Sequence, residues 1–185
     1  MTTSGRGFVA SRLTVLPPCA TPGPSENRVT LKVGDTAPEF EVEAQQAGQN
    51  RRIRLHELRG KKNVVLYFYP RDFTPVCTRE ACGFRDLYAE LASKDTEVIG
   101  VSVDGEDSHG RFAEKHGVTF PLVSDPEKAL ARTYGATSLL RDLLGATKRI
   151  TYVIDKRGVI TAIFESQLRA SQHVDGVKAA IAALG

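Results

Sequence analysis

The chain has 185 residues, of which 41% are hydrophobic and 25% charged, a composition typical of a globular protein with a single domain. Its formal net charge of +3 lies mostly in the first thirty residues, so the remainder has no basic excess of the kind that nucleic-acid binding requires. Three cysteines are too few for a disulfide-stapled secreted scaffold, and no apolar run approaches the roughly 18 residues of a membrane-spanning helix. We therefore expect a soluble protein that binds neither nucleic acid nor membranes and whose few thiols are available for chemistry.

Residues 1–30 are rich in Ser, Thr, Pro and Gly, and Glu26 is their only acid. A segment of this composition lacks the apolar side chains that a packed core needs. We expect either a disordered extension, an organelle-targeting segment or a start site assigned too far upstream. The targeting segment is considered because arginine without acid is also typical of a transit peptide. The protein is accordingly expected in the cytoplasm, with an organelle as the alternative, and Cys19 is expected to be an incidental thiol of this extension.

Residues 31–185 show no internal repeat or linker and are predicted to form one domain. Three runs are β-branched or aromatic at most positions, as is typical of strands buried on both faces: NVVLYFY (63–69), TEVIGVSV (96–103) and RITYVID (149–155). Residues 155–158 supply turn chemistry between the last run and VITAIF (159–164), which predicts a hairpin.

Helical periodicity lies between these strands. One helix is predicted to bury the face formed by Phe84, Leu87, Tyr88 and Leu91. Shorter helices are predicted near 108–116, 126–134 and 171–184. This alternation predicts an α/β domain with a thioredoxin-like fold, in which a mixed central sheet is flanked by helices.

The stretch YPRDFTPVCTREAC (69–82) places two cysteines where the first buried strand gives way to a helix. Thr74 is a favoured N-cap residue and Pro75 a favoured first helical residue, so the helix is predicted to begin there, with Cys77 in its first turn. The N–H groups and the positive end of the dipole at a helix start stabilise a thiolate over a thiol. Cys77 is therefore a candidate nucleophile.

Cys82 follows Cys77 by five residues in the same predicted helix. Residues so spaced have Cα atoms at least roughly 7.5 Å apart and side chains about 140° apart around the axis. A disulfide needs Cα atoms within about 7 Å and converging Cβ vectors. A Cys77–Cys82 disulfide therefore requires local unfolding of roughly residues 75–84, which Gly83, a poor helix former, favours.

Other interpretations of the two cysteines stay open on these grounds. Both could be small buried residues of an amphipathic helix. A metal site is disfavoured because no histidine of the chain completes a four-ligand pattern, and the C-x-x-C motif of plain thiol–disulfide exchange is absent. No glycine-rich phosphate loop follows a strand, so no nucleotide, flavin or metal cofactor is predicted.

The same stretch resembles the active-site signature of the peroxiredoxins. PRDFTPVC matches Pro-x-x-x-Thr-x-x-Cys at Pro70, Thr74 and Cys77, and the second cysteine is similar to that of the peroxiredoxin Q (bacterioferritin comigratory protein) branch, an atypical two-cysteine type. The resemblance covers about residues 31–184. Further segments are similar to family segments, in family order: 33–40, 64–86, 98–104, 122–125, 148–160 and 164–175.

The resemblance implies a role for each matched residue. Cys77 would be the peroxidatic cysteine, which attacks a peroxide and becomes a sulfenic acid, and Cys82 the resolving cysteine. Arg149 would be the active-site arginine, reaching in from a neighbouring strand. Thr74 would hydrogen-bond the thiolate or the peroxide, and Pro70 would shape the loop and shield the sulfenic acid. Taken singly, Arg149, Thr74 and Pro70 are better interpreted as a surface charge, an N-cap and the end of a strand. Together with Cys77, in family order, they favour the functional roles.

By the same resemblance the protein would be a thiol-dependent peroxidase for hydrogen peroxide and organic hydroperoxides. Its Cys77–Cys82 disulfide would be recycled by thioredoxin or a thioredoxin-like reductant, without a cofactor, in a monomer or weak homodimer. One departure concerns the segment before Arg149, where many bacterial members carry a Trp and Lys/Gly-rich insert. ATSLLRDLLGATK (136–148) lacks it and is similar to the plant and cyanobacterial form.

Four further polar residues lie near these motifs or on the helix predicted near 108–116. Glu80 and Arg85 either join the hydrogen-bond frame of the site or lie on a solvated helix face. His109 and His116 are expected on a surface helix, and no role is assigned to them.

Two other classes of function compete with the peroxidase. A thiol–disulfide oxidoreductase without peroxidase activity is disfavoured because the Pro-x-x-x-Thr-x-x-Cys stretch stands in place of C-x-x-C. A thioredoxin-fold interaction or chaperone-like module, in which the thiols are structural, predicts two slowly reacting thiols. Substitution of Cys77 by serine separates these hypotheses, since it should abolish peroxide turnover only in the peroxidase.

Overall fold

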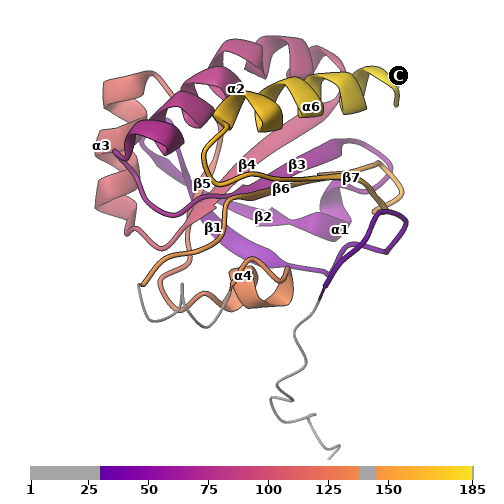
Figure 1. Cartoon of the computed structure of the whole chain (residues 1–185), viewed down its shortest axis with the longest axis horizontal. Helices are drawn as coiled ribbons and strands as arrows, with labels where there is room; N and C mark the ends of the chain where they lie inside the picture. Colours follow the sequence, from indigo (N-terminus) through magenta and orange to yellow (C-terminus); the bar gives the residue numbers. More distant parts are fainter. Residues whose placement is uncertain (1–29, 138–144, 185) are drawn as a thin grey trace, which may run out of the picture.

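The structure is a computed structural model that describes residues 30–137 and 145–184 (Figure 1). The expectations for the first 29 residues, Cys19 among them, and for most of the segment 136–148 lie outside the described residues. The described elements, in chain order, are β1 (Glu41–Gln46), β2 (Gln49–Arg54), α1 (Leu55–Leu58), β3 (Asn63–Phe68), α2 (Pro75–Ser93), β4 (Thr96–Ser102), α3 (Glu106–His116), β5 (Leu122–Ser124), α4 (Ala129–Thr133), β6 (Ile150–Ile154), β7 (Ile160–Glu165) and α6 (Ala170–Ala182).

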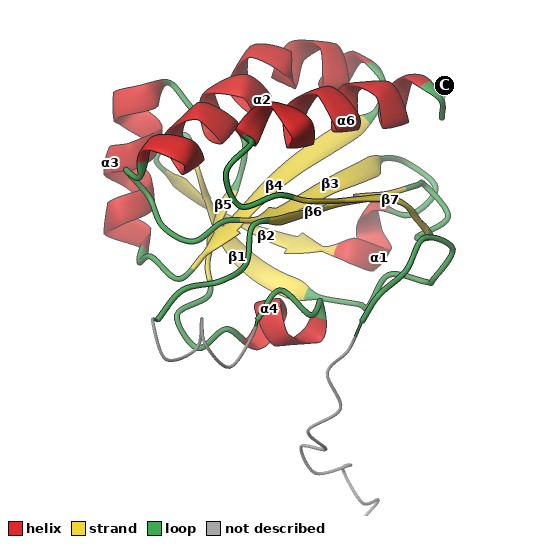
Figure 2. Cartoon of the chain, in the orientation of Figure 1, coloured by secondary structure: helices red, strands yellow, loops and turns green. Residues whose placement is uncertain are grey.

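In the described part of the chain, seven strands form one mixed sheet in the order β2-β1-β5-β4-β3-β6-β7 (Figure 2). The central strands β3, β4 and β5 are parallel, whereas β6, β7, β1 and β2 each pair antiparallel. The buried strands predicted at 63–69, 96–103 and 149–155 are confirmed as β3, β4 and β6, and the predicted hairpin as β6–β7. The longest predicted helix is α2, and α3, α4 and α6 lie where the shorter helices were expected.

Each face of the sheet carries its own hydrophobic core. Side chains of β3 alternate between them, as they must in an extended strand: Leu66 and Phe68 face the core that includes Tyr134, next to α4, while Tyr67 faces the core under α2 and α6. In Figure 1, α2 and α6 lie over one face and α4 lies on the other. Because β3 is covered on both sides, all of its residues are buried and its sequence is apolar almost throughout.

The hairpin β1–β2 was not predicted from the sequence. Its residues are mostly polar because the hairpin forms an edge of the sheet, where pairs such as Arg52 with Glu43 at 2.7 Å and Arg54 with Glu41 at 3.0 Å link the two strands. Ala47 and Gly48 turn the chain with φ values of 50° and 78°. Positive φ at both central residues is the requirement of the type I′ turn, one of the two common two-residue hairpin turns.

The sheet brings the start of β6 next to the end of β3. The two strands run antiparallel with Phe68 opposite Ile150, so Arg149, just before β6, lies at the edge where the chain leaves β3 and enters α2. The loop of residues 69–74 and the first turn of α2 share this edge. All five residues of the predicted site therefore belong to two neighbouring segments of the fold or to α2 itself.

Candidate active site

The loop between β3 and α2 is anchored by a buried carboxylate, that of Asp72. Its Oδ1 accepts a hydrogen bond from the Tyr69 hydroxyl at 2.8 Å and its Oδ2 one from the Ser108 hydroxyl at 2.7 Å, while its backbone N–H donates to Asp104 at 2.8 Å. Burial alone would raise the pKa of Asp72, but its hydrogen bonds, that with His109 first, lower it. These bonds fix a loop in which Phe73 has a φ of 58°, an uncommon conformation for a residue with a side chain.

His109 corrects a sequence-based expectation. It was expected on a surface helix, and it does lie on α3, but its side chain is fully buried. Nδ1 lies 2.9 Å from Oδ2 of Asp72 and Nε2 lies 3.2 Å from the Val123 carbonyl oxygen. The prediction was wrong because α3 is polar along most of its length, so no apolar periodicity marks the face that packs on the sheet. His116, at the end of the same helix, is partly exposed.

The start of α2 agrees with the prediction. The helix begins at Pro75 with Thr74 as its N-cap residue, and the Thr78 N–H donates to the Thr74 carbonyl at 2.9 Å. The Thr74 side chain caps no helical N–H; instead its hydroxyl donates to the Arg71 carbonyl at 3.2 Å, within the loop. Cys77 therefore lies in the first turn, where backbone N–H groups have no partner inside the helix. Pro70 is half-buried at the start of the loop.

The structure brings Cys77 and Arg149 into contact. Cys77 is 1% exposed and Arg149 2% exposed, and the guanidinium Nη2 donates to the sulfur at 3.0 Å. Nη1 of the same guanidinium forms an ion pair with Oε2 of Glu80, and Nε donates to the Gln167 carbonyl at 3.3 Å. The arginine is thus held from three sides, with one donor directed at the sulfur in a site that is shielded from bulk water.

The charges of this site act on one another. Burial works against the charged form of Arg149, but the neighbouring Glu80 and Cys77 outweigh it, so the pKa of Arg149 is raised. For Glu80 burial is the larger influence and Arg149 opposes it, so the pKa of that carboxyl is raised to about 7. These two effects on the pKa of Glu80 oppose each other, since the ion pair with Arg149 favours the ionised carboxylate. Burial has the greater effect because Oε1 of Glu80 has no hydrogen-bond partner among the described residues.

Of the two charged residues left open by the sequence, Glu80 belongs to the frame of the site and Arg85 does not. Glu80 is fully buried, whereas Arg85 pairs with Asp86 at 2.7 Å and donates to the His116 carbonyl at 2.6 Å. A sequence signal for Glu80 existed: it follows Cys77 by three residues and precedes Phe84 by four, which places all three on one face of the helix.

Cys82 lies on the same unbroken helix as Cys77, and both are free thiols. Its side chain is partly exposed and lines a groove of about 600 Å³ between α2 and the start of α6. The wall of the groove formed by the segment before α6 includes Leu168, which is 79% exposed. The two thiols therefore have different surroundings: one is enclosed beside Arg149 and the other is reachable from solvent.

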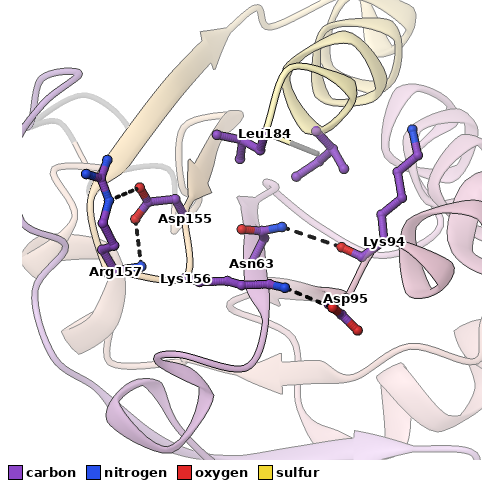
Figure 3. Close-up of a pocket in the computed structure, with 8 residues that line it drawn as sticks. Asn63, Lys94, Asp95, Asp155, Lys156, Arg157 and Leu184 are labelled. Atoms are coloured by element: carbon purple, nitrogen blue, oxygen red, sulfur yellow. Dashed lines mark hydrogen bonds and ion pairs between the residues drawn. The ribbon is translucent and has the colours of Figure 1, made fainter.

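A second pocket, of about 460 Å³, lies at the opposite end of β3, roughly 17 Å from the loop by strand length (Figure 3). Four of its charged side chains form two ion pairs, Lys156 with Asp95 at 2.8 Å and Arg157 with Asp155 at 2.9 Å, and Lys94 pairs with Glu90 outside the pocket at 3.9 Å. We assign it no part in the chemistry of Cys77.

The described residues lack two other kinds of feature. No group of three or more His, Cys, Asp or Glu side chains is arranged to hold a metal ion in this part of the chain. Within the same residues, no helix combines the length and apolar character needed to cross a bilayer.

Comparisons with known proteins bear on the whole domain. Residues 33–163 match the model of the AhpC/TSA family. The chloroplastic peroxiredoxin Q of Sedum lineare is 39% identical over 153 residues, which are 81% of this chain and 78% of the relative. Peroxiredoxin Bcp of Bacillus subtilis is 38% identical over 133 residues, 70% of this chain and 82% of that protein. The crystal structure of peroxidoxin BcpB from Mycobacterium tuberculosis is similar with a TM-score of 0.73 at 36% identity, covering 84% of this chain and 99% of that one.

Fold and relatives together define a thiol-dependent peroxidase with a thioredoxin-like fold, and the predicted fold class is confirmed. The chain belongs to the AhpC/TSA family, and within it the chain is similar to the peroxiredoxin Q and Bcp proteins, as its signature indicated.

Proposed function

We propose that this protein reduces hydrogen peroxide and organic hydroperoxides at Cys77, resolves the product with Cys82 and is recycled by thioredoxin or a thioredoxin-like reductant. The observation that carries the proposal is the 3.0 Å contact between Arg149 Nη2 and the sulfur of Cys77, which is 1% exposed. A fixed charged donor at a water-excluded sulfur favours the thiolate and needs little reorganisation during the reaction.

In the first step the Cys77 thiolate attacks the distal oxygen of the peroxide in line with the O–O bond. That bond breaks, the sulfur becomes a sulfenic acid, and the leaving oxygen takes up a proton and departs as water or an alcohol. Arg149 can serve both atoms because its guanidinium presents several donors in one plane. The ion pair with Glu80 keeps that plane in place.

Thr74 and Pro70 would act on the peroxide side of the loop. The Thr74 hydroxyl already gives its proton to the Arg71 carbonyl, so its lone pairs are available to accept the O–H of a hydroperoxide. Pro70, half-buried after Tyr69, would limit the freedom of the loop and the access of water to the sulfenic acid.

In the second step the Cys82 thiol attacks the sulfenic sulfur, an S–S bond forms and the sulfenic oxygen leaves as water. Because both cysteines lie on one helix, the first turns of α2 must unwind, and the burial of Glu80, Ala81 and Phe84 must be given up locally. An external dithiol then reduces the disulfide through a mixed disulfide. The groove beside Cys82 gives such a reductant an approach to that sulfur.

The test is a count of thiols. A Cys19→Ser protein, in which only the two site cysteines remain, is reduced, mixed with one equivalent of hydrogen peroxide and quenched within seconds. We expect both thiols to disappear with a loss of about two mass units, mapped to Cys77 and Cys82. A Cys82→Ser variant should consume one equivalent and then stop at the sulfenic acid, whereas Cys77→Ser should consume none.

Each other outcome has a definite meaning. Peroxide turnover in Cys77→Ser would refute the assignment of the peroxidatic residue. Thiols that ignore peroxide but react with protein disulfides would support the alternative, a thiol–disulfide oxidoreductase. The peroxiredoxin names of the relatives speak against that alternative and against an interaction module with structural thiols.

For the organisation of the chain, we infer a catalytic domain of residues 31–185 and an N-terminal extension of residues 1–30. Relatives from Sedum lineare and Gentiana triflora are named chloroplastic, which favours an organelle over the cytoplasm. A fluorescent protein carrying residues 1–30 should then accumulate in an organelle, and a diffuse cytoplasmic signal would contradict this. Sedimentation of the reduced enzyme should show a monomer or a weak homodimer.

A further inference from the structure

Behind Arg149 a second layer of buried polar residues joins α2, β6 and α6. It consists of Glu80, Thr151 and His173, and all three residues are fully buried. Oε1 of Glu80 has no hydrogen-bond partner among the described residues, and it lies 3.5 Å from Nδ1 of His173. A buried carboxylate oxygen without a hydrogen-bond donor destabilises the folded protein. The imidazole of His173 is the neighbouring group that can share a hydrogen with this oxygen.

The hydrogen bonds of His173 define its tautomer. Nε2 lies 3.0 Å from the Ser166 carbonyl oxygen, which can only accept, so Nε2 carries a hydrogen. Nδ1 lies 2.8 Å from the Thr151 hydroxyl, which can donate to it. A neutral ring with a lone pair on Nδ1 fits both contacts, and the lowered pKa of His173 favours this form. Burial lowers the pKa of His173, and so does the positive charge of Arg149. The hydrogen bond to the Ser166 carbonyl raises this pKa but does not outweigh them.

One added proton would give Oε1 of Glu80 the hydrogen-bond partner that it lacks, and Nδ1 of His173 would exchange its bond with Thr151 for one with Glu80. The proton can reside on Oε1 of Glu80 and be donated to Nδ1, or on Nδ1 and be donated to Oε1, and in either case the Thr151 hydroxyl turns away. Among the other titratable groups, Arg149, just before β6, acts on both members of the pair. The charge of Glu80 also acts on Tyr67, on β3, while Cys77, on α2, acts on Arg149. The carboxyl and the imidazole should therefore titrate as one coupled pair.

We propose that His173 is a positioning residue of the peroxidatic site: with Glu80 it binds one proton, and this proton sets how strongly Glu80 holds Arg149. The inference rests on the proposed function of Cys77 and Arg149. Without the proton, Arg149 is shared between the Glu80 carboxylate and the sulfur. With the proton bound, the pair no longer neutralises Arg149, so more positive charge faces Cys77 and the peroxide.

Two substitutions of His173 separate titration from packing. The amide of His173→Asn can occupy the place of Nδ1 and donate permanently to Glu80, but it does not titrate. The longer His173→Gln can keep the bond to the Ser166 carbonyl and leaves Glu80 without the imidazole nitrogen. His56→Asn is the matched control, since its imidazole on α1 is 62% exposed and lies outside the site.

The readout is the rate of Cys77 oxidation by hydrogen peroxide in a Cys82→Ser background, from roughly pH 5.5 to 9. The parent and His56→Asn should show two ionisations, that of the thiol and that of the Glu80–His173 pair. The oxidation rate of His173→Asn should stay within about threefold of the parent rate, and its pH profile should lack the second ionisation. The oxidation rate of His173→Gln should fall about tenfold below the parent rate, the loss expected when one hydrogen bond to a charged group is removed.

A measurement on the unmutated site guards against misfolded variants. Nitrogen chemical shifts of the His173 ring and the infrared band of a protonated carboxyl should report uptake of one proton at the midpoint of the second ionisation. An imidazole that keeps its neutral form, with no carboxylic acid band across the range, would overturn the proposal, as would two ionisations in His173→Asn. A parent protein that does not react with peroxide at any pH would instead refute the proposed function.

Discussion

The guanidinium of Arg149 lies 3.0 Å from the sulfur of Cys77 although 72 positions separate the two residues in the chain. The contact exists because β6 runs antiparallel to β3, which places the residue before β6 at the edge where β3 ends and α2 begins. Glu80, one turn further along α2, takes the other arm of the guanidinium. A single buried arginine thus contacts the thiol and also holds the first turns of α2 against the sheet.

Replacing Arg149 should slow the attack on peroxide. We expect a fall in the second-order rate of Cys77 oxidation of roughly 10² to 10³-fold in Arg149→Gln, the range observed when a preorganised donor to developing charge is removed. Arg149→Lys should be intermediate, because a compact ammonium cannot reach the sulfur and Glu80 together. Peroxide consumption in single turnover measures both variants.

Arg157→Lys is the matched control for Arg149, since the Arg157 side chain is 79% exposed at the β6–β7 turn. It should react like the unmodified protein. A rate for Arg149→Gln within about twofold of the parent would remove Arg149 from the chemistry.

Glu80→Gln should change how stability depends on pH. Burial raises the pKa of Glu80 from 4.5 to about 7, so the folded protein binds a proton that the unfolded chain has released between these values. The stabilising contribution is complete below pH 4.5 and is lost as the pH rises to about 7. Relative to Glu80→Gln, the parent should therefore lose up to ~3 kcal/mol of unfolding free energy across this window.

Urea denaturation of both proteins at several pH values measures this difference. Glu114→Gln, an exposed change on α3, serves as the control and should run parallel to the parent. A free-energy difference between the parent and Glu80→Gln that stays constant with pH would show that Glu80 is ionised throughout, as the ion pair with Arg149 alone would make it.

Asp72→Asn should loosen the loop that precedes Cys77. An amide has only one acceptor oxygen, so it cannot accept the hydrogen bonds of Tyr69, Ser108 and His109 as the carboxylate does. We therefore expect the free energy of unfolding to fall by ~3 kcal/mol at neutral pH and the reaction with peroxide to be slower. Since the hydrogen bonds lower the pKa of Asp72, its contribution is present above pH 3.8 and lost below it, and the stability difference from the parent should shrink in acid.

Asp107→Asn, an exposed change on α3, is the control for Asp72→Asn. Denaturation and single-turnover oxidation should both leave Asp107→Asn close to the parent. An Asp72→Asn protein that is destabilised but oxidised at the normal rate would show that the loop anchor serves stability alone.

Gly83 should control the closure of the disulfide through the helix. A Cβ at this position would lie 2.8 Å from Val174 Cγ2, so Gly83→Ala is best examined together with Val174→Ala, which removes the crowding. In the Val174→Ala background, alanine favours the helix over glycine by about 1 kcal/mol and should slow loss of the second thiol after peroxide about fivefold.

Ala89→Gly is the control for position 83, because it destabilises α2 at a residue beyond the segment that is expected to unwind. It should leave the closure rate unchanged. Equal closure rates with glycine and alanine at position 83 would contradict unwinding through this part of α2.

The strands β3, β4 and β6 were predictable because they are buried on both faces and their side chains are apolar at most positions. The hairpin β1–β2 was not, because an exposed edge is made of polar residues whose pairing depends on their neighbours in the sheet. The start of α2 was also predicted to the residue, because Pro75 at the first helical position acts through local backbone geometry, although the Thr74 hydroxyl makes no cap bond.

The sequence by itself determined which residues carry the signature, which fold they belong to and that the two thiols share a helix, because these follow from local propensity, periodicity and motif. The tertiary structure decided what surrounds them. Burial of Glu80, His109 and His173 depends on contacts between residues distant in the chain, and a polar side chain enters a core only when such partners meet it there. Spacing along one helix does not reveal those partners, and the packing of β6 and α6 against α2 supplies them.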